Sequence, residues 1–70
     1  MQRFGEKLRY LRRQQGLTLR GLAEDIDLSF SHLGNVESGK RKPSADLIFK
    51  IAKFFKVSTD SLMDDELELD

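Results

Sequence analysis

Cysteine is absent from this 70-residue sequence. Its absence excludes disulfide bonds and thiolate zinc clusters, so the packing of secondary structure alone must stabilise the fold. Long apolar runs are also absent: none approaches the roughly 20 residues that cross a bilayer, and the chain does not begin with the apolar stretch of a signal peptide. These absences predict one small cytoplasmic domain that does not enter a membrane.

Residues that carry enzymatic chemistry are scarce. The sequence offers no nucleophile paired with a base, no cluster of metal ligands and no glycine-rich phosphate loop. The single histidine, His32, has no second ligand near it in sequence, which favours a surface or phosphate-contacting residue over a metal ligand. We therefore predict that the protein is not an enzyme and holds neither a metal nor a cofactor.

The net charge is zero, but the two signs of charge are separated along the chain. All 12 lysines and arginines precede Val57, whereas six of the 12 acidic residues follow it. Residues 1–57 therefore carry a charge of +6 and residues 58–70 a charge of −6. This pattern indicates a polarised molecule with a basic body and an acidic tail, although two solvated charge clusters that maintain solubility would give the same pattern.

Apolar residues at helical spacing predict two helices in the first part of the chain. Residues 3–15 carry one apolar stripe among basic residues, and Gly16 ends this helix. The stripe consists of Phe4, Leu8 and Leu11. Thr18 can cap a second helix of about two turns. Its apolar face consists of Leu22, Ala23 and Ile26, and Asp27 and Leu28 form a tight link to the next segment.

Three further helices are predicted after this link. Ser29 can cap the third, which turns Leu33 and Val36 inward and ends at Gly39. A basic loop, residues 40–43, precedes a fourth helix that begins near Ser44. Its core face should consist of Ile48, Ile51, Ala52 and Phe55, with Leu47, Phe49 and Phe54 partly covered. Ser58 can cap a short fifth helix that carries Leu62.

The predicted fold class is all-α, a compact bundle of four to five short helices. Residues 1–63 form the domain, and residues 64–70 form an acidic tail that is too short and too charged to fold alone. The pattern contains no strand, repeat or linker.

Residues 16–44, GLTLRGLAEDIDLSFSHLGNVESGKRKPS, resemble the Cro/C1 type (XRE family) of helix-turn-helix transcription regulators. The resemblance runs from about Phe4 to Met63. The matching positions are Gly16, Leu17, Thr18, Leu22, Ala23, Ser29, Leu33, Val36, Glu37, Gly39, Lys40, Arg41, Pro43, Ser44, Ile51, Ala52, Val57, Ser58 and Leu62. It implies a lambda-repressor-like fold, a helix-turn-helix over residues 18–38 and double-stranded DNA as the partner.

The residues support this resemblance on physical grounds. Ala23 falls where two steeply crossed helices approach closely, and Leu33 and Val36 fix the third helix on the first two. The opposite face of the helix from Ser29 to Ser38 is then directed to solvent. Small and amide side chains on that face would allow the helix to enter a major groove about 12 Å wide.

The resemblance implies base contacts from Phe30, Ser31 and Asn35. Asn35 could pair bidentately with adenine or be an ordinary exposed residue, and the same alternatives hold for Ser31. Phe30 could press on a thymine methyl group or pack back on the second helix. Backbone contacts are expected from residues beside this face, where phosphates would run. They are Thr18, Arg20, Ser29, His32, Ser38, Lys40, Arg41 and Lys42. Arg12 and Glu37 are instead expected to form a structural pair.

Several positions depart from the family pattern. Leu19 replaces a usual glutamine and so removes one polar contact, and Asp27 replaces a glycine in the turn, where φ is positive. Gly34 and Gly21 lie inside the third and the second predicted helix, where glycine is unfavourable. Close approach to DNA would explain Gly34. Lys56 replaces a glycine after the fourth helix, which is therefore expected to end less sharply.

The predicted function is sequence-specific DNA binding by a homodimer that represses transcription at a pseudo-palindromic operator. Residues that could supply an apolar dimer patch are Leu62, Met63, Leu67 and Leu69. The alternative is a protein-interaction module that resembles an antitoxin or anti-repressor and binds a regulatory protein. In either case the acidic tail could fold over the basic surface and compete with phosphate.

Overall fold

The computed structural model describes residues 2–69, and within them it contains five α-helices and no strand. The helices are α1 (Phe4–Gln14), α2 (Leu19–Asp25), α3 (Phe30–Glu37), α4 (Ala45–Phe55) and α5 (Thr59–Met63). This confirms the all-helical prediction. No helix in the described part of the chain is both long enough and apolar enough to span a membrane.

Four of the five helices begin at a residue whose hydroxyl group accepts a backbone N–H three residues further on. The N-caps of α2 to α5 are Thr18, Ser29, Ser44 and Ser58, with N···O distances of 3.0 to 3.1 Å. Each such cap stabilises a helix by about 1 kcal/mol. Three of these caps and the start near Ser44 were predicted, and the structure confirms these helix starts.

The helix α1 begins differently, because the side chain of its N-cap residue, Arg3, makes no capping hydrogen bond. Instead the backbone N–H groups of Gln2 and Arg3 donate to the carboxylate of Asp65, each at 2.8 Å. A residue close to the end of the described chain thus accepts hydrogen bonds from the backbone N–H groups at the start of the first helix.

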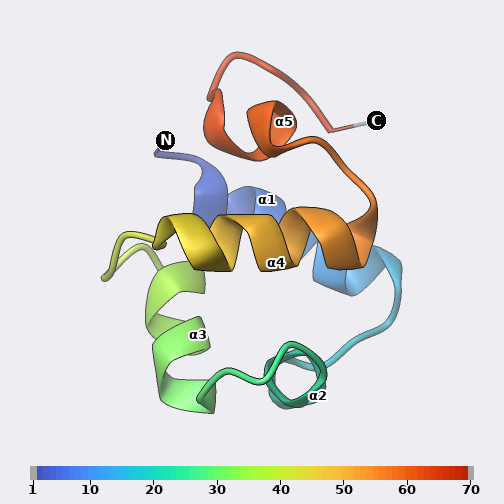
Figure 1. The fold of residues 1–70 in the computed structure, drawn as a ribbon, viewed down its shortest axis with the longest axis vertical. Helices are drawn as coiled ribbons and strands as arrows, with labels where there is room; N and C mark the ends of the chain where they lie inside the picture. The colour runs from blue at the N-terminus through green and yellow to red at the C-terminus, as the bar shows by residue number, and fades with distance from the viewer. Residues whose placement is uncertain (1, 70) are drawn as a thin grey trace.

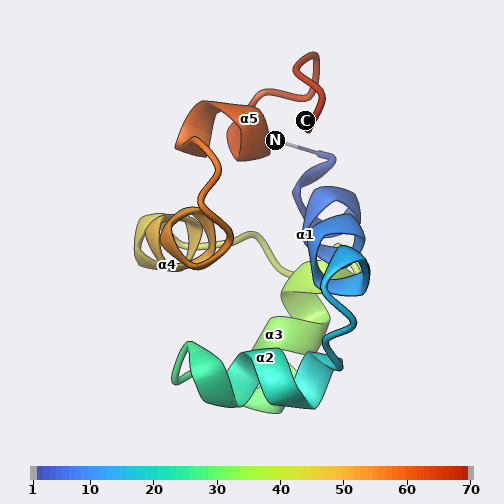
Figure 2. The ribbon, with the colours of Figure 1, turned by 90° about the vertical axis from the view of Figure 1, so that its right-hand side faces the viewer.

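The helices are arranged in layers along the long axis of the molecule. In Figure 1, α4 crosses in front of α1, α5 lies above them, and α2 and α3 lie below. The view turned by 90° gives the same order, with α1 and α4 on opposite sides of the middle layer (Figure 2). The segment that follows α5 therefore lies at the end of the molecule opposite α2 and α3.

The core lies between these layers and takes residues from every helix. Its buried members are Phe4, Leu8, Leu22, Ala23, Ile26, Leu33, Val36, Leu47, Ile48, Ile51, Ala52, Phe55 and Leu62. The expected partial cover of Leu47 is wrong, because this side chain is buried. Leu47 precedes Ile51 by four residues and so shares its helix face. The expected partial cover of Phe49 is also wrong, because this residue falls on the outer face of α4 and is 66% exposed.

Among residues 2–69, two non-glycine residues adopt the left-handed backbone conformation. Asp27 has φ 57° in the link between α2 and α3, as predicted for this turn. Lys56 has φ 58° and ψ 43°, and the N–H of Val57 donates to the carbonyl of Ala52 at 3.0 Å. The expected gradual end of α4 is therefore wrong, because Lys56 adopts the conformation that glycine usually supplies.

Candidate DNA-binding interface

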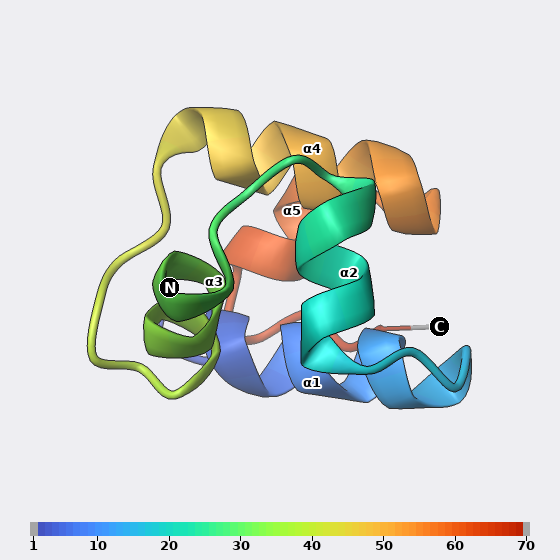
Figure 3. The same ribbon diagram turned by 90° about the horizontal axis from the view of Figure 1, so that it is seen from below.

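The link between α2 and α3 is short and closed by backbone hydrogen bonds. The N–H of Leu28 donates to the carbonyl of Ala23 at 2.8 Å, and Ala23 itself is only 2% exposed. Seen from below, α2 and α3 lie side by side nearest the viewer, with α3 almost end-on and with α1 and α4 behind them (Figure 3). The two short helices thus form one outer end of the molecule.

The orientation of α3 is fixed by its buried residues. Leu33 and Val36 lie in the core, so the opposite face of the helix is directed to solvent. The predicted recognition residues on that face are all exposed: Phe30, Ser31, Asn35 and Ser38. Only small or uncharged side chains stand on this face, which therefore offers hydrogen-bonding groups without a strong charge of its own.

Phe30 also contacts α2. The guanidinium carbon of Arg20 lies 4.3 Å from the centroid of the Phe30 ring, and Phe30 remains 41% exposed. This contact matches the predicted alternative in which the ring packs on the second helix.

Three of the predicted hydroxyl groups already form hydrogen bonds within the chain. Thr18 and Ser29 accept backbone N–H groups as N-caps, which leaves each hydroxyl hydrogen able to donate outward. Ser38 donates to the carbonyl of Asn35 at 3.2 Å. His32 is half-buried, and residues 2–69 contain no group of three His, Cys, Asp or Glu side chains that could hold a metal ion.

The basic loop, residues 40–43, lies directly beside α3. Lys40, Arg41 and Lys42 are all exposed, and the N–H of Arg41 donates to the carbonyl of Asn35 at 3.1 Å. Gly39, with φ 86°, allows the chain to turn out of α3 at this point. The loop is therefore tied to α3, and its three cations lie at the carboxyl end of that helix.

A buried carboxylate holds α1 against α3, as predicted for Arg12 and Glu37. The side chain of Glu37 is 6% exposed, and Arg12 donates to its two oxygens at 2.8 and 3.1 Å. Burial raises the pKa of Glu37, but the hydrogen bonds from Arg12 and Arg9 outweigh this effect and hold the pKa below its ordinary value. Arg9, at 3.1 Å, is a partner that sequence reasoning missed.

Gly5 is a second residue at this junction that sequence reasoning missed. A Cβ atom at this position would press on the carbonyl oxygen of Glu37 and lie 2.9 Å from the carbonyl oxygen of Val36. The close approach of α1 to the end of α3 therefore requires glycine. A glycine inside an otherwise regular helix was the available signal.

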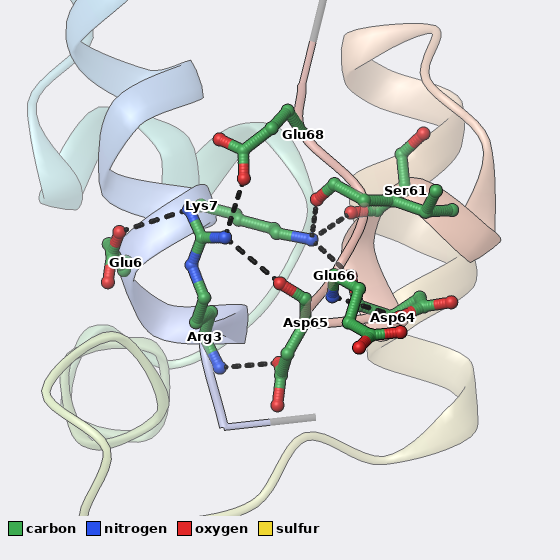
Figure 4. Close-up of polar contacts among 9 residues, drawn as sticks. Arg3, Glu6, Lys7, Ser61, Asp64, Asp65, Glu66 and Glu68 are labelled. Carbon is green, nitrogen blue, oxygen red and sulfur yellow. Dashed lines mark hydrogen bonds and ion pairs between the residues drawn. The ribbon is translucent and has the colours of Figure 1, made fainter.

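The acidic tail is clamped to α1. The side chains of Arg3 and Lys7 project from α1 toward the segment that follows α5 (Figure 4). The Lys7 ammonium group donates to three backbone carbonyls, those of Ser61, Asp64 and Leu67, the last two at 2.7 Å. Lys7 is only 2% exposed, and we call this arrangement of Lys7 and its three carbonyls the tail clamp.

Further contacts of the tail involve Arg3. The guanidinium group donates to the carboxylate of Glu68 at 2.8 Å and to the carbonyl of Asp65 at 3.0 Å. Hydrogen bonds from the backbone of Arg3 and Gln2 lower the pKa of Asp65 to about 2. The tail thus packs on the basic residues Arg3 and Lys7. The expected competition with phosphate at the predicted DNA-binding face does not fit this structure, because the tail lies at the opposite end from α2 and α3.

The expected apolar dimer patch is also reduced. Leu62 is fully buried in the core, and Leu69 packs partly against it. Met63 and Leu67 remain exposed, at 41% and 43%.

Comparison with known proteins decides the family. The model of the family described as Helix-turn-helix matches residues 8–62, which is most of the chain. This chain belongs to the Cro/C1-type helix-turn-helix family of transcription regulators. The matched region begins in α1 and ends in α5, so this helix-turn-helix protein shares with its family the whole helical scaffold.

Individual relatives agree with this assignment. The uncharacterized HTH-type transcriptional regulator YazB of Bacillus subtilis is 37% identical over 59 residues, which cover 84% of this chain and 86% of YazB. The HTH-type transcriptional activator BcrR of Enterococcus faecalis is 40% identical over 63 residues, 90% of this chain but only 31% of BcrR. This helix-turn-helix protein thus matches some relatives over nearly their full length and others over one part.

A solved structure supports the fold. The N-terminal DNA-binding domain of SinR from Bacillus subtilis superposes with a TM-score of 0.87 at 26% sequence identity. The match covers 97% of this chain and 100% of the SinR domain. The helix-turn-helix protein described here therefore shares its arrangement of five helices, within residues 2–69, with that domain.

Proposed function

We propose that this helix-turn-helix protein is a sequence-specific regulator that inserts α3 into the major groove of double-stranded DNA. The observation that carries the proposal is the exposed, lightly charged face of α3 beside the basic loop Lys40–Lys42. A face of this kind can form hydrogen bonds with base edges, while the flanking cations attract the phosphates on either side of the groove.

Roles for individual residues follow from their positions. Ser31 and Asn35 would contact base edges. Phe30, at the start of the helix, lies beside them and contacts Arg20 of α2. Phosphate contacts would come from the exposed lysines, arginines and hydroxyl groups around this face, and from one half-buried histidine. They are Thr18, Arg20, Ser29, His32, Ser38, Lys40, Arg41 and Lys42. A Cβ atom at Gly34 would lie 3.4 Å from the Leu19 side chain, which is an ordinary contact, so packing within the protein does not require glycine there. Close approach of α3 to DNA would explain this glycine.

Repression is the proposed outcome of binding, because occupation of a promoter needs no surface beyond the one that binds DNA. A homodimer in the cytoplasm would read a pseudo-palindromic operator with half-sites about 34 Å apart. Exposed Met63 and Leu67 support a contact between two copies near α5. The oligomeric state can be measured by sedimentation of the protein with and without operator DNA, and a Met63→Glu variant should then sediment as a monomer.

The decisive experiment selects DNA. Purified protein is mixed with a random duplex pool at two salt concentrations, and the retained DNA is sequenced. We expect a two-fold symmetric site whose affinity falls steeply with salt, because phosphate contacts release counterions. Asn35→Ala should relax the preference at one base pair and cost about 1 to 3 kcal/mol, whereas Lys40→Ala should weaken all sequences alike.

A matched control is Lys53→Ala, which removes an exposed cation from α4 and should leave binding unchanged. If no sequence is enriched and binding at low salt is micromolar or weaker, the proposal fails. A test for a protein partner would then be the next step, since the same fold can bind proteins.

A further inference from the structure

Arg20 and Phe30 lie on different helices, but the guanidinium group of Arg20 lies over the ring of Phe30. The guanidinium carbon lies 4.3 Å from the ring centroid, within the range of about 6 Å over which a cation is attracted to an aromatic face. Both residues are exposed, so the pair lies on the surface that α2 and α3 share. Sequence reasoning assigned them separate roles, one on phosphate and one on a base.

We propose that Phe30 is a positioning residue whose ring holds the Arg20 guanidinium in place to bind one bidentate acceptor on DNA. This inference rests on the proposed function, DNA binding through α3. The two side chains then act as one unit that spans the turn between the helices. Phe30 would influence recognition through Arg20 and not by pressing on a thymine methyl group.

The chemistry of the guanidinium group supports this arrangement. It is planar, and its five N–H bonds lie in the plane, so a group whose face rests on a ring directs its donors outward along its edge. No ion pair between the residues of the described range 2–69 involves Arg20, so no carboxylate within that range neutralises its charge. The N–H donors of this guanidinium group therefore remain available to a ligand.

Two acceptors on DNA match a fork of parallel N–H donors. One is the O6 and N7 pair of guanine in the major groove, and the other is a pair of phosphate oxygens. Both need the guanidinium to be held in one orientation, because a long, flexible side chain loses conformational entropy when it binds. The ring at the start of α3 supplies that orientation before DNA arrives.

The test is a double-mutant cycle on the selected operator duplex. Phe30→Leu keeps an apolar side chain but removes the aromatic face, and we expect it to weaken binding by about fivefold. In the Arg20→Ala background the same substitution should have almost no effect, because the group that it positions is gone. Phe30→Tyr retains the face and should bind like the parent protein. Melting temperatures of all variants verify that they are folded.

Lys40→Ala provides the matched control, because Lys40 is a proposed phosphate contact outside the stacked pair. In that background Phe30→Leu should still cost about fivefold. The acceptor is identified by sequence selection with Arg20→Ala. A preference lost at one base pair assigns guanine, whereas a uniform loss with a salt slope reduced by about one assigns phosphate.

Two results would overturn the inference while DNA binding itself stands. One is additivity of Phe30→Leu and Arg20→Ala. The other is a penalty for Phe30→Leu that disappears when uracil replaces thymine in the operator, since this would show that the ring touches a thymine methyl group. If the parent protein enriches no duplex at all, the proposed function fails and the inference fails with it.

Discussion

Replacement of Lys7 by methionine should lower the free energy of unfolding by about 3 kcal/mol. Methionine retains the length of the buried stem but cannot donate to the carbonyls of the tail clamp. Lys7 is 2% exposed, and its ammonium group donates to three backbone oxygens. Bonds from a charged donor are individually strong, but the cost of burying the ammonium group offsets part of that strength, so each bond contributes about 1 kcal/mol net.

This loss is large for a domain of this size. A chain of 70 residues typically unfolds with a free energy of roughly 5 kcal/mol, so the substitution should remove more than half of it. The melting temperature should fall by about 15 °C, since 1 kcal/mol corresponds to roughly 5 °C in a small domain.

The assay is urea and thermal unfolding followed by circular dichroism, with Lys53→Met as the control. Lys53 is exposed on α4, so its replacement should change the free energy of unfolding by less than about 0.5 kcal/mol. If Lys7→Met is as mild as this control, the tail clamp does not exist in solution and the reasoning is refuted.

Three further predictions concern the junction of α1 with α3 and the start of α1. Gly5→Ala should lower the free energy of unfolding by about 1 to 3 kcal/mol, because its Cβ would press on the carbonyl of Glu37. Gly34→Ala is the control in the same denaturation assay and should be neutral or stabilising by up to about 1 kcal/mol. Glu37→Gln should cost about 3 kcal/mol, because Arg12 would lose its charge partner in a largely buried site, whereas Arg9→Gln should cost less than about 1 kcal/mol because Arg9 is half exposed. Equal losses for the two variants would contradict the assignment. The pKa of Asp65, about 2 against an ordinary 3.8, means that its stabilisation is complete above about pH 4 and is lost as the pH falls toward 2. An Asp65→Asn variant should therefore show a weaker dependence of stability on pH in this window.

The helices could be predicted because their boundaries are marked by local chemistry. A serine or threonine hydroxyl caps a helix through the amide three residues away, and Gly16 and Gly39 supply positive φ where α1 and α3 end. Both signals act within one turn of the chain. The exposed face of α3 was predictable for a related reason, because the apolar residues Leu33 and Val36 determine which side faces the core.

The tail clamp could not be predicted, because its acceptors carry no side-chain signal. Lys7 stands in a helix rich in basic residues and would ordinarily be solvated, and its partners are backbone carbonyls 54 to 60 residues away. Gly5 is similar, since its necessity depends on the approach of another helix. Stacking of Arg20 on Phe30 depends on two rotamers on either side of a turn, which residue types alone do not determine.

From the position of the acidic tail we predict how the effect of its charges on DNA binding depends on salt. The tail and the α2–α3 end lie at opposite ends of a molecule whose longest extent is 28 Å (Figures 1 and 2). At about 0.15 M salt the screening length is about 8 Å, so tail charges should scarcely influence the DNA interface, whereas at about 0.01 M it reaches about 30 Å. The double variant Glu66→Gln/Glu68→Gln removes two exposed charges and leaves the carbonyls of the tail clamp in place. Its affinity for DNA should match that of the parent protein within about twofold at the higher salt and exceed it at the lower salt. An equal gain at both salt concentrations would mean that the tail reaches the DNA-binding face directly, because only a short-range contact escapes screening.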